Sequence, residues 1–480
     1  MSENRAAWLL LLTALALGLL GDYLLRAPLW GLNVALGLTA MALVAFVCSL
    51  RPTPGLKPRS QGARWPWGAA VFFAAMWAVR DAELLLVVDL LAALSLACLP
   101  LIPGGHAGLR QAGVLELVAA ALGTAWRTAT GGADLIRSLG PLTTRRAVAV
   151  GLGLLLSIPF VLGFGALFAS ADPLFGRVVS SLIGVELERL LSHSLLIAVL
   201  TWAAAGYLWT HMGSRPLRFP APPAVRLGGT QVITVLGATA LVFAFFVAVQ
   251  AGSLFGGEAF IRNQTGLTYA EYARRGFFQI VLAAGLSLPL VYVAPFVVSP
   301  STRRAAVLHA LMSIQLGLTT LVLASALWRL GLYVRAYGLT EDRLYGAAVL
   351  LWIAATIAIF VATVLRGRPA GAAYGTIVAA MVILAALNLA NPAALIARYH
   401  LSHQERRAAD IAYLARLGAD AVPTLVSRLE DVAPGDRCTL AKSLINRYRK
   451  SSEDWRGWNL ARLRARRAVV QLDPFARSCP

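Results

Sequence analysis

Residues 229–251 read GTQVITVLGATALVFAFFVAVQA and contain no charged side chain. A run of this length and composition is long enough to cross the hydrocarbon core of a bilayer as an α-helix. Similar runs recur along the 480-residue chain, in which 58% of residues are hydrophobic and 14% are charged. Soluble domains are closer to about 45–50% apolar and about 25% charged. The composition therefore predicts a multi-pass membrane protein and excludes a disordered chain, a disulfide scaffold and most soluble enzymes.

About eleven such segments are expected to form an all-α, polytopic transmembrane helix bundle over residues 1–391. They lie at residues 7–25, 28–50, 65–79, 82–103, 147–169, 191–211, 229–251, 276–297, 305–330, 345–365 and 371–391. The stretch at about 104–146 is too interrupted for a span and is predicted to be an amphipathic interfacial segment. Residues 392–480 lack a long apolar run, and their helical spacing predicts a small soluble C-terminal domain.

The chain is strongly basic, with 43 Lys and Arg against 23 Asp and Glu and a net charge of +20. In a membrane protein this excess is first a topology signal, because Lys and Arg accumulate in cytoplasmic loops. Their distribution predicts a cytoplasmic N-terminus and, with eleven spans, an extracytoplasmic C-terminal domain. Cys438 and Cys479 in that domain can pair only in an oxidising compartment. The alternative, a miscounted span around 65–126, would place the domain inside.

The densest polar cluster follows the seventh span. Thr268 and Glu271 have the spacing of a capping box, which satisfies free N–H groups at a helix start, and this structural interpretation is favoured. The alternative is a binding site, because arginine forks and tyrosine hydroxyls suit an anionic head group. The candidate residues of this first cluster are Tyr269, Glu271, Tyr272, Arg274 and Arg275.

A second cluster follows the ninth span. Thr340 is a plausible N-cap, and two acids in the first turn of the next helix would complement its dipole. The candidate binding residues are Tyr333, Arg335, Tyr337 and Arg343, with the tyrosines also interpreted as interfacial anchors. Because both clusters lie on the same predicted face, they can meet and bind an anionic lipid or a small anionic ligand.

Asp89 lies inside the fourth span, where an ionisable group is costly and indicates either a functional site or a polar link between helices. The spacing of His400 and His403 is only weakly typical of metal ligands, and no metal site is predicted. No phosphate-binding, hydrolase or zinc-protease motif occurs, so no cofactor is expected and no catalytic residue is assigned. The basic, aromatic helix near 453–471 is expected to contact a lipid surface or a protein, and no nucleic acid is expected.

Five blocks resemble bacterial multi-pass membrane families that are catalogued as domains of unknown function, numbers 4153 and 4173. The blocks are FAFFVAVQAGSLFGG, GLTYAEYARRGFF, LYVRAYGLTEDRLY, ANPAALIARYHL and YLARLGADAVPTL, and the resemblance extends from about Asp172 to Leu425. It implies an integral protein of the bacterial cytoplasmic (inner) membrane. It assigns no activity and no catalytic residue.

Two classes of function fit these observations. The first is transport, or envelope sensing and scaffolding, with a ligand or lipid site at the outer leaflet and the bilayer as the main partner. The second is a membrane-embedded enzyme acting on a lipid-linked substrate, similar to a glycosyltransferase. The second would require acids such as Asp22, Asp89, Asp172 and Glu271 to approach one another in a cleft. The sequence favours a protein without catalytic activity.

Overall fold

The computed structural model describes the whole chain except residues 1, 51–62, 103, 140–149, 151–152, 154–156, 158–159, 162, 183–186, 213–226, 256–275, 299–301, 404–409, 450–453 and 480. The described part is helical and contains no β-strand, which confirms the predicted all-α class. The chain divides into two compact units. Unit 1 comprises residues 1–109, 116–219 and 452–460, and unit 2 comprises residues 110–115, 220–451 and 461–480.

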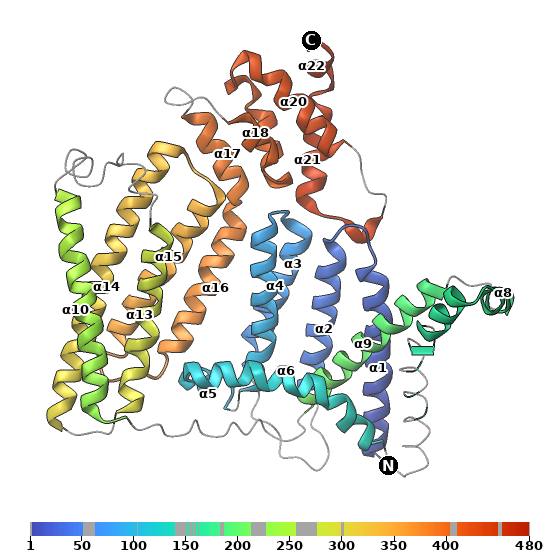
Figure 1. Ribbon diagram of the computed structural model, residues 1–480, viewed down its shortest axis with the longest axis horizontal. Coiled ribbons are helices and arrows are strands. Elements are labelled where there is room, and N and C mark those ends of the chain that lie inside the picture. Colours follow the sequence, from blue (N-terminus) through green and yellow to red (C-terminus); the bar gives the residue numbers. More distant parts are fainter. Residues whose placement is uncertain are drawn as a thin grey trace. The chain divides into compact units, whose positions relative to one another are not determined.

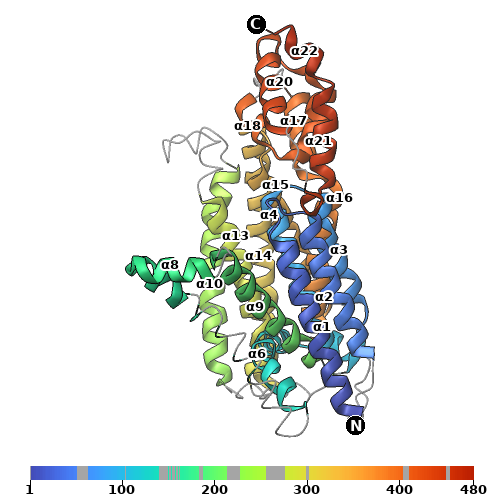
Figure 2. The same cartoon turned by 90° about the vertical axis from the view of Figure 1, so that its right-hand side faces the viewer.

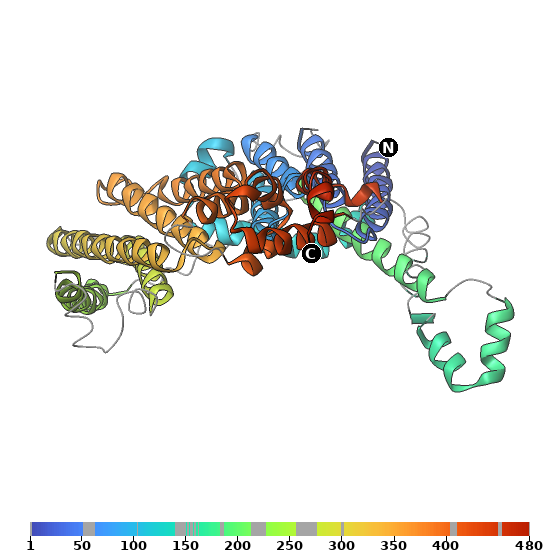
Figure 3. The same ribbon diagram turned by 90° about the horizontal axis from the view of Figure 1, so that it is seen from above.

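Unit 1 is built from long apolar helices and one crossing helix (Figure 1). Its helices are α1 (Ser2–Leu25), α2 (Leu32–Leu50), α3 (Trp65–Val79), α4 (Glu83–Cys98), η1 (Leu99–Leu101), α5 (Gly105–Gln111), α6 (Val114–Arg137), α8 (Pro173–Leu182) and α9 (Leu187–His211), with the short η4 (Trp455–Gly457). The helices α5 and α6 take a few residues from unit 2. Figure 3 shows α8 at a distance from α1 and α2, beyond the start of α9.

The helices α1 and α9 run antiparallel and pack closely. Near one end His193 of α9 contacts Asp22 of α1, and near the other Leu208 shares a buried cluster with Leu10. Between them, a Cβ atom placed on Gly18 would lie 2.1 Å from the Thr201 hydroxyl oxygen. Such close approach by small residues is the usual way for helices to associate where no water is available to drive packing.

The helix α6 runs across the direction of α1–α4 (Figures 1 and 2). It packs on α9 through glycines, since a Cβ on Gly206 would lie 2.0 Å from the carbonyl oxygen of Thr128. The indole of Trp202 on α9 also donates to the Ala129 carbonyl at 2.7 Å. The helix has buried and exposed apolar positions, among them the exposed Trp126, but it is not among the helices apolar enough to span a membrane.

In unit 2 five long helices alternate in direction. They are α10 (Gly229–Phe255), α13 (Phe277–Val297), α14 (Thr302–Tyr337), α15 (Glu341–Ala362) and α16 (Ala372–Ala390). The start of α10 meets the end of α13, where the Leu227 amide donates to the Val297 carbonyl at 3.0 Å. The end of α10, the start of α13, the turn between α14 and α15, and the end of α16 therefore lie at the opposite end of the unit (Figure 1).

Polar side chains link these helices. Ser287 of α13 and Thr319 of α14 share a hydrogen bond of 2.9 Å, and both are buried. Ser325 of α14 donates to the side-chain oxygen of Gln250 on α10. Hydrogen bonds of this kind hold helices together within a bilayer, where each is worth about 1 kcal/mol.

The remaining helices of unit 2 follow the fifth long helix and are short. They are α17 (Pro392–Ser402), α18 (Ile411–Arg416), η2 (Ala419–Ala421), α19 (Val422–Ser427), η3 (Leu429–Asp431), α20 (Pro434–Tyr448), α21 (Leu460–Val470) and α22 (Asp473–Arg477). Their apolar faces share one buried cluster that includes Ile396, Leu425, Leu444 and Val469. That residues 392–480 form a separate domain stays a prediction.

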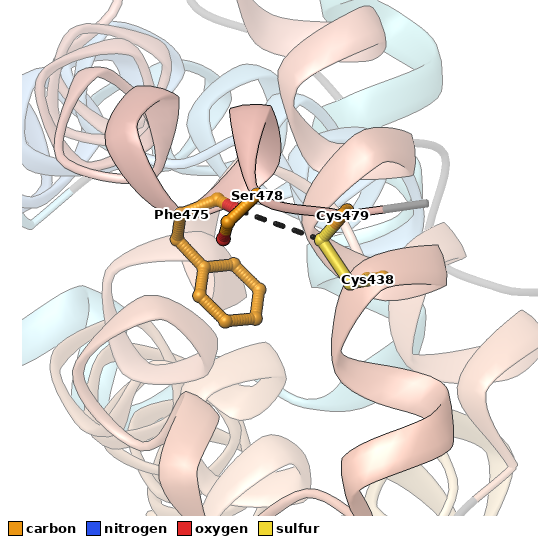
Figure 4. The surroundings of a disulfide bond; sticks show 4 residues. All are labelled: Cys438, Phe475, Ser478 and Cys479. Atoms are coloured by element: carbon orange, nitrogen blue, oxygen red, sulfur yellow. Dashed lines mark hydrogen bonds between the residues drawn. A yellow bond between two sulfur atoms is a disulfide. The ribbon is translucent and has the colours of Figure 1, made fainter.

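A disulfide bond joins α20 to the chain end. Cys438 and Cys479 are bonded, with their Cα atoms 5.7 Å apart, and the Cys479 sulfur also contacts the Phe475 carbonyl (Figure 4). The bond fastens α22 to α20 across 41 residues of sequence. The other two cysteines, Cys48 and Cys98, lie on apolar helices and are not part of this disulfide.

Residues 454–459 bind the turns of unit 1. The Leu32 amide at the start of α2 donates to the Trp458 carbonyl at 2.8 Å. The Asn459 side chain, 3% exposed, donates to the carbonyls of Trp77 and Arg80 at 2.9 and 2.7 Å, which closes the end of α3. This segment therefore supplies partners for backbone groups that the helix ends leave unpaired.

Nine described helices are long and apolar enough to cross a membrane, and each corresponds to one of the predicted spans. The predicted span at 65–79 is a helix of 15 residues, Trp65–Val79, below the length of the other nine. The predicted span at 147–169 lies partly outside the described residues, and its last residues, 163–169, are helical. The structure thus confirms a multi-pass helical protein, with the span count of about eleven remaining approximate.

Replacing Gly206 with alanine is expected to destabilise unit 1. The added methyl group would meet the Thr128 backbone, which cannot move as a side chain can. Overpacking of this kind costs about 1–3 kcal/mol. Thermal unfolding in detergent should show a lower Tm for Gly206→Ala, whereas the control Gly68→Ala, which has no atom within 4 Å of the new methyl, should unfold at or above the wild-type temperature. An unchanged Tm for Gly206→Ala would contradict the close packing of α6 and α9.

Candidate functional site

The sharp turn between α14 and α15 builds the candidate site of unit 2. Gly338 adopts a φ of 80°, which favours glycine, and a Cβ there would lie 2.7 Å from the His400 ring. The Nε2 atom of His400 lies 2.7 Å from the Leu339 carbonyl oxygen. Thr340 occupies the N-cap position of α15 as expected, but its hydroxyl makes no capping hydrogen bond. The turn is therefore held by the contact with His400 of α17 and not by a hydrogen bond from its own N-cap residue.

Arg343 folds back over this turn. Its guanidinium carbon lies 3.9 Å from the centre of the Tyr333 ring and 5.9 Å from that of Tyr337, and it donates to the Gly338 carbonyl. The two tyrosine rings are themselves in edge contact, with centroids 5.3 Å apart. A guanidinium over aromatic faces is held by cation–π attraction. Three of the residues that the sequence proposed for this cluster are thus brought together.

A pocket of about 290 Å³ opens beside this arginine. It is lined by Phe277, Phe278, Tyr333, Thr340, Glu341, Asp342, Arg343 and Tyr413. The first two residues begin α13, the next five belong to α14, α15 and their turn, and the last belongs to α18. The pocket therefore lies where three candidate spans begin or end and where a helix of the C-terminal region meets them.

Tyr413 joins the C-terminal region to the pocket. Its hydroxyl oxygen accepts a hydrogen bond from the Glu341 amide at 3.3 Å, and its own amide donates to the Asp410 carboxylate at 2.9 Å. Its ring lies 5.8 Å from that of His400. Burial raises the pKa of the Tyr413 hydroxyl above its ordinary value, and the hydrogen bond from the Glu341 amide opposes the increase. The hydroxyl is therefore neutral at physiological pH.

The pocket has mixed charge. One arginine faces two acids, Glu341 and Asp342, and the rest of the lining is aromatic or hydroxylic. Carboxylates repel a purely anionic ligand, whereas a ligand with both a phosphate and an ammonium group can satisfy both signs. Aromatic faces add attraction for an ammonium group.

The structure separates the sequence-predicted residues into three groups. Tyr333 and Arg343 line the pocket, and Tyr337 contacts the arginine beside it. Arg335, on the same helix, is exposed and does not line the pocket. The first cluster, Tyr269, Glu271, Tyr272, Arg274 and Arg275, lies outside the described residues, although the chain resumes immediately after it with Gly276 and the pocket residue Phe277. Sequence reasoning missed Tyr413 and Phe277.

The acids named for the enzyme alternative have different surroundings. Asp22 is buried and pairs with Arg26 at 2.8 Å and His193 at 2.5 Å. Asp89 is fully buried in α4. Asp172 accepts from the Leu174 amide at 2.8 Å and so caps α8, and Glu271 lies outside the described residues. In the part of the chain that the structure describes, no group of three or more His, Cys, Asp or Glu could hold a metal ion.

The described helices and this pocket define the class: an all-helical, multi-pass integral membrane protein with a polar pocket at the ends of its spans. Residues 67–427 match the family described as "Domain of unknown function (DUF4153)". Because this match covers well over half of the 480 residues, the chain belongs to that family. The match begins about a hundred residues before Asp172, where the resemblance of the quoted blocks was taken to start, and so also includes α4, α6 and most of α3. No curated protein and no solved structure matches the chain.

Tyr413 gives this site a pH dependence. Because its folded-state pKa is raised, the stabilisation from the neutral hydroxyl is complete below the ordinary tyrosine pKa of about 10 and is lost as pH rises through the folded-state pKa. Wild type should therefore lose Tm relative to Tyr413→Phe as pH is raised from 8 to 11. Thermal unfolding of both proteins at each pH tests this. Parallel curves would show that Tyr413 titrates normally.

Proposed function

We propose that this protein recognises a lipid head group in the pocket between Tyr333, Arg343 and Tyr413 and acts as a membrane sensor or scaffold. The observation that carries the proposal is the position of that pocket. It lies at the ends of candidate spans, where lipid head groups are found, and its lining combines a cation, two carboxylates and aromatic rings. A head group that carries a phosphate and an ammonium fits that lining better than a purely anionic one.

The two charges of such a head group would have separate partners. The phosphate would pair with Arg343, whose guanidinium fork suits phosphate oxygens. The ammonium would lie toward Glu341 and Asp342, with Phe277 and Tyr333 supplying aromatic faces. Arg274 and Arg275 immediately precede Gly276 in the chain and are proposed as further phosphate partners.

Tyr413 makes the pocket suitable for sensing. It is the lining residue from the C-terminal region, and it contacts the first amide of α15. A head group seated between α15 and Tyr413 would bind one arrangement of the two elements better than another, and only such a difference in affinity can shift a conformational equilibrium. The C-terminal helices would then report lipid composition to a partner.

The proposed location is the bacterial cytoplasmic membrane, with the N-terminus in the cytoplasm and the C-terminal region outside. Two observations support this topology. The disulfide between Cys438 and Cys479 fits an oxidising compartment. In unit 1, Leu135 of α6 lies with Leu10 near the start of α1, whereas His193 of α9 meets the end of α1. The end of α6 and the start of α9 thus lie near opposite ends of α1, which supports the span that the sequence predicts at 147–169.

Arg343→Ala should weaken binding of phosphatidylethanolamine about tenfold or more, as expected for loss of a charge-assisted hydrogen bond. Native mass spectrometry of the full chain, titrated with this lipid, gives the affinity. Arg335→Ala is the matched control, since it removes an exposed arginine of α14 that does not line the pocket. Asp342→Asn should shift the preference from phosphatidylethanolamine toward phosphatidylglycerol. Equal affinities for wild type, Arg343→Ala and Arg335→Ala would refute the proposed site.

Removing the disulfide should destabilise the C-terminal helices. The bond closes a loop of 41 residues, for which chain entropy predicts about 4 kcal/mol. Cys438→Ser with Cys479→Ser should therefore become sensitive to proteolysis within residues 410–479, while Cys48→Ser with Cys98→Ser should not. A maleimide that cannot cross membranes, applied to intact cells after reduction, should label the wild-type pair. Labelling that requires lysis would place this region in the cytoplasm.

A further inference from the structure

Four exposed aromatic side chains gather at one end of unit 1. Trp30, Trp455 and Trp458 are 56, 52 and 41% exposed, and Tyr23 is 51% exposed. The rings of Tyr23 and Trp455 contact each other, with centroids 6.4 Å apart. We call these four residues the aromatic collar of unit 1. Because tryptophan is on average a largely buried residue, several exposed ones beside one another mark a surface that interacts with something.

The helices that carry the collar fix its level relative to a bilayer. The candidate spans in α1 and α2 are joined by residues 26–31, so this turn lies at a membrane surface. The C-terminal region is bound to the same place. The Leu32 amide donates to the Trp458 carbonyl at 2.8 Å, and Arg456 donates to the Tyr23 carbonyl. Both tryptophans of the C-terminal region are therefore held at the level where two spans leave the hydrocarbon core.

The charges beside the collar are paired within the protein. Arg456 donates to Asp454 from Nε at 3.0 Å and from Nη2 at 2.6 Å, and its guanidinium carbon lies 4.7 Å from the centre of the Tyr23 ring. Arg26 pairs with Asp22 at 2.8 Å. Because each arginine already has a carboxylate partner, its attraction for a further anion is weak. The collar therefore suits a neutral partner that combines apolar surface with hydrogen-bond acceptors.

The collar is distinct from the basic helix that follows it. The sequence predicted a lipid or protein contact for one basic, aromatic helix near 453–471. In the structure both tryptophans precede α21, which begins at Leu460, and belong to unit 1. The arginines at 462, 464, 466 and 467 lie within α21 and belong to unit 2. The aromatic part of the predicted contact thus stands on its own.

We propose that residues 454–459 are an interfacial anchor, whose tryptophans lie with Tyr23 and Trp30 in the glycerol and ester layer of the bilayer. Tryptophan and tyrosine favour this layer, because an apolar ring can face the chains while the N–H or O–H meets ester oxygens and water. The occupant is the bilayer because the collar continues into the lipid-facing surface of the spans, where Leu19 of α1 and Leu43 of α2 are exposed. The inference is independent of the head-group pocket, which belongs to unit 2.

A spin label measures the depth of the two tryptophan positions. Trp455→Cys and Trp458→Cys are labelled one at a time in a Cys48→Ser, Cys98→Ser background that keeps the disulfide, and the full chain is placed in phosphatidylcholine vesicles. Oxygen concentrates in the lipid and a nickel chelate in the water. The ratio of the relaxation that each causes therefore reports how deep the label lies.

Two reference positions bracket the expected result. Leu241→Cys lies at an exposed position of the α10 span and gives the ratio for hydrocarbon, whereas Lys442→Cys, exposed on α20, gives the ratio for water. The labels at 455 and 458 should give ratios between these two. A ratio equal to that of Lys442→Cys would overturn the proposal. Protection from both reagents would also overturn it, since a protein partner and not the bilayer would then cover the collar.

A second measurement keeps aromatic rings at both positions and so remains decisive if the cysteine variants do not fold. The difference in fluorescence between wild type and Trp455→Phe with Trp458→Phe is the emission of the two tryptophans. In vesicles whose lipid chains carry bromine near the ester, this difference should be largely lost. The loss should be the same for phosphatidylcholine and phosphatidylglycerol, because the neighbouring arginines are paired. A difference that bromine leaves unchanged, or a loss confined to phosphatidylglycerol, would overturn the assignment to the ester layer.

Discussion

Backbone hydrogen bonding is the constraint on which this structure depends. A segment within the bilayer core finds no water, so each amide and carbonyl must be paired inside the protein, and an uninterrupted helix pairs them all. Irregular backbone is therefore confined to helix ends. In unit 2 the turn at Gly338, the start of α13 and the beginning of α15 gather at one end, and the polar pocket lies there. The polar pocket lies at the helix ends because backbone groups that a helix leaves unpaired are tolerated there and not within the bilayer core.

Packing within the bundle follows from the same environment. Because lipid is as apolar as leucine, burial of leucine gives little drive for helices to associate, and close backbone contact takes its place. Gly18 and Gly206 provide such contacts on either side of α9. Among the same helices, side chains of α1, α2, α4 and α9 line an open apolar cavity of about 670 Å³. Unit 1 therefore combines close backbone contacts at its glycines with an apolar cavity between the same helices.

Local features of the fold could be predicted from the sequence, whereas features joining distant residues could not. The span at 229–251 is encoded in one continuous run, and Arg343 lies close enough to Tyr333 in sequence for their meeting to be expected. Tyr413 was missed because its partner, Glu341, is 72 residues away and no pattern links them. The contact of Asn459 with Trp77 spans 382 residues. The N-cap position of Thr340 was recognised, but the turn is held by His400, which spacing alone had suggested only as a weak metal ligand.

In each unit, side chains of residues 392–480 form hydrogen bonds with backbone groups at helix ends. Helix ends expose backbone groups that need partners, and side chains from residues 392–480 provide them. In unit 2, the Tyr413 hydroxyl oxygen accepts from the first amide of α15. In unit 1, Asn459 donates to two carbonyls at the end of α3. In unit 2 the bond from the first amide of α15 connects a span end to helices that share a buried cluster and a disulfide, so this span end and those helices are stabilised together.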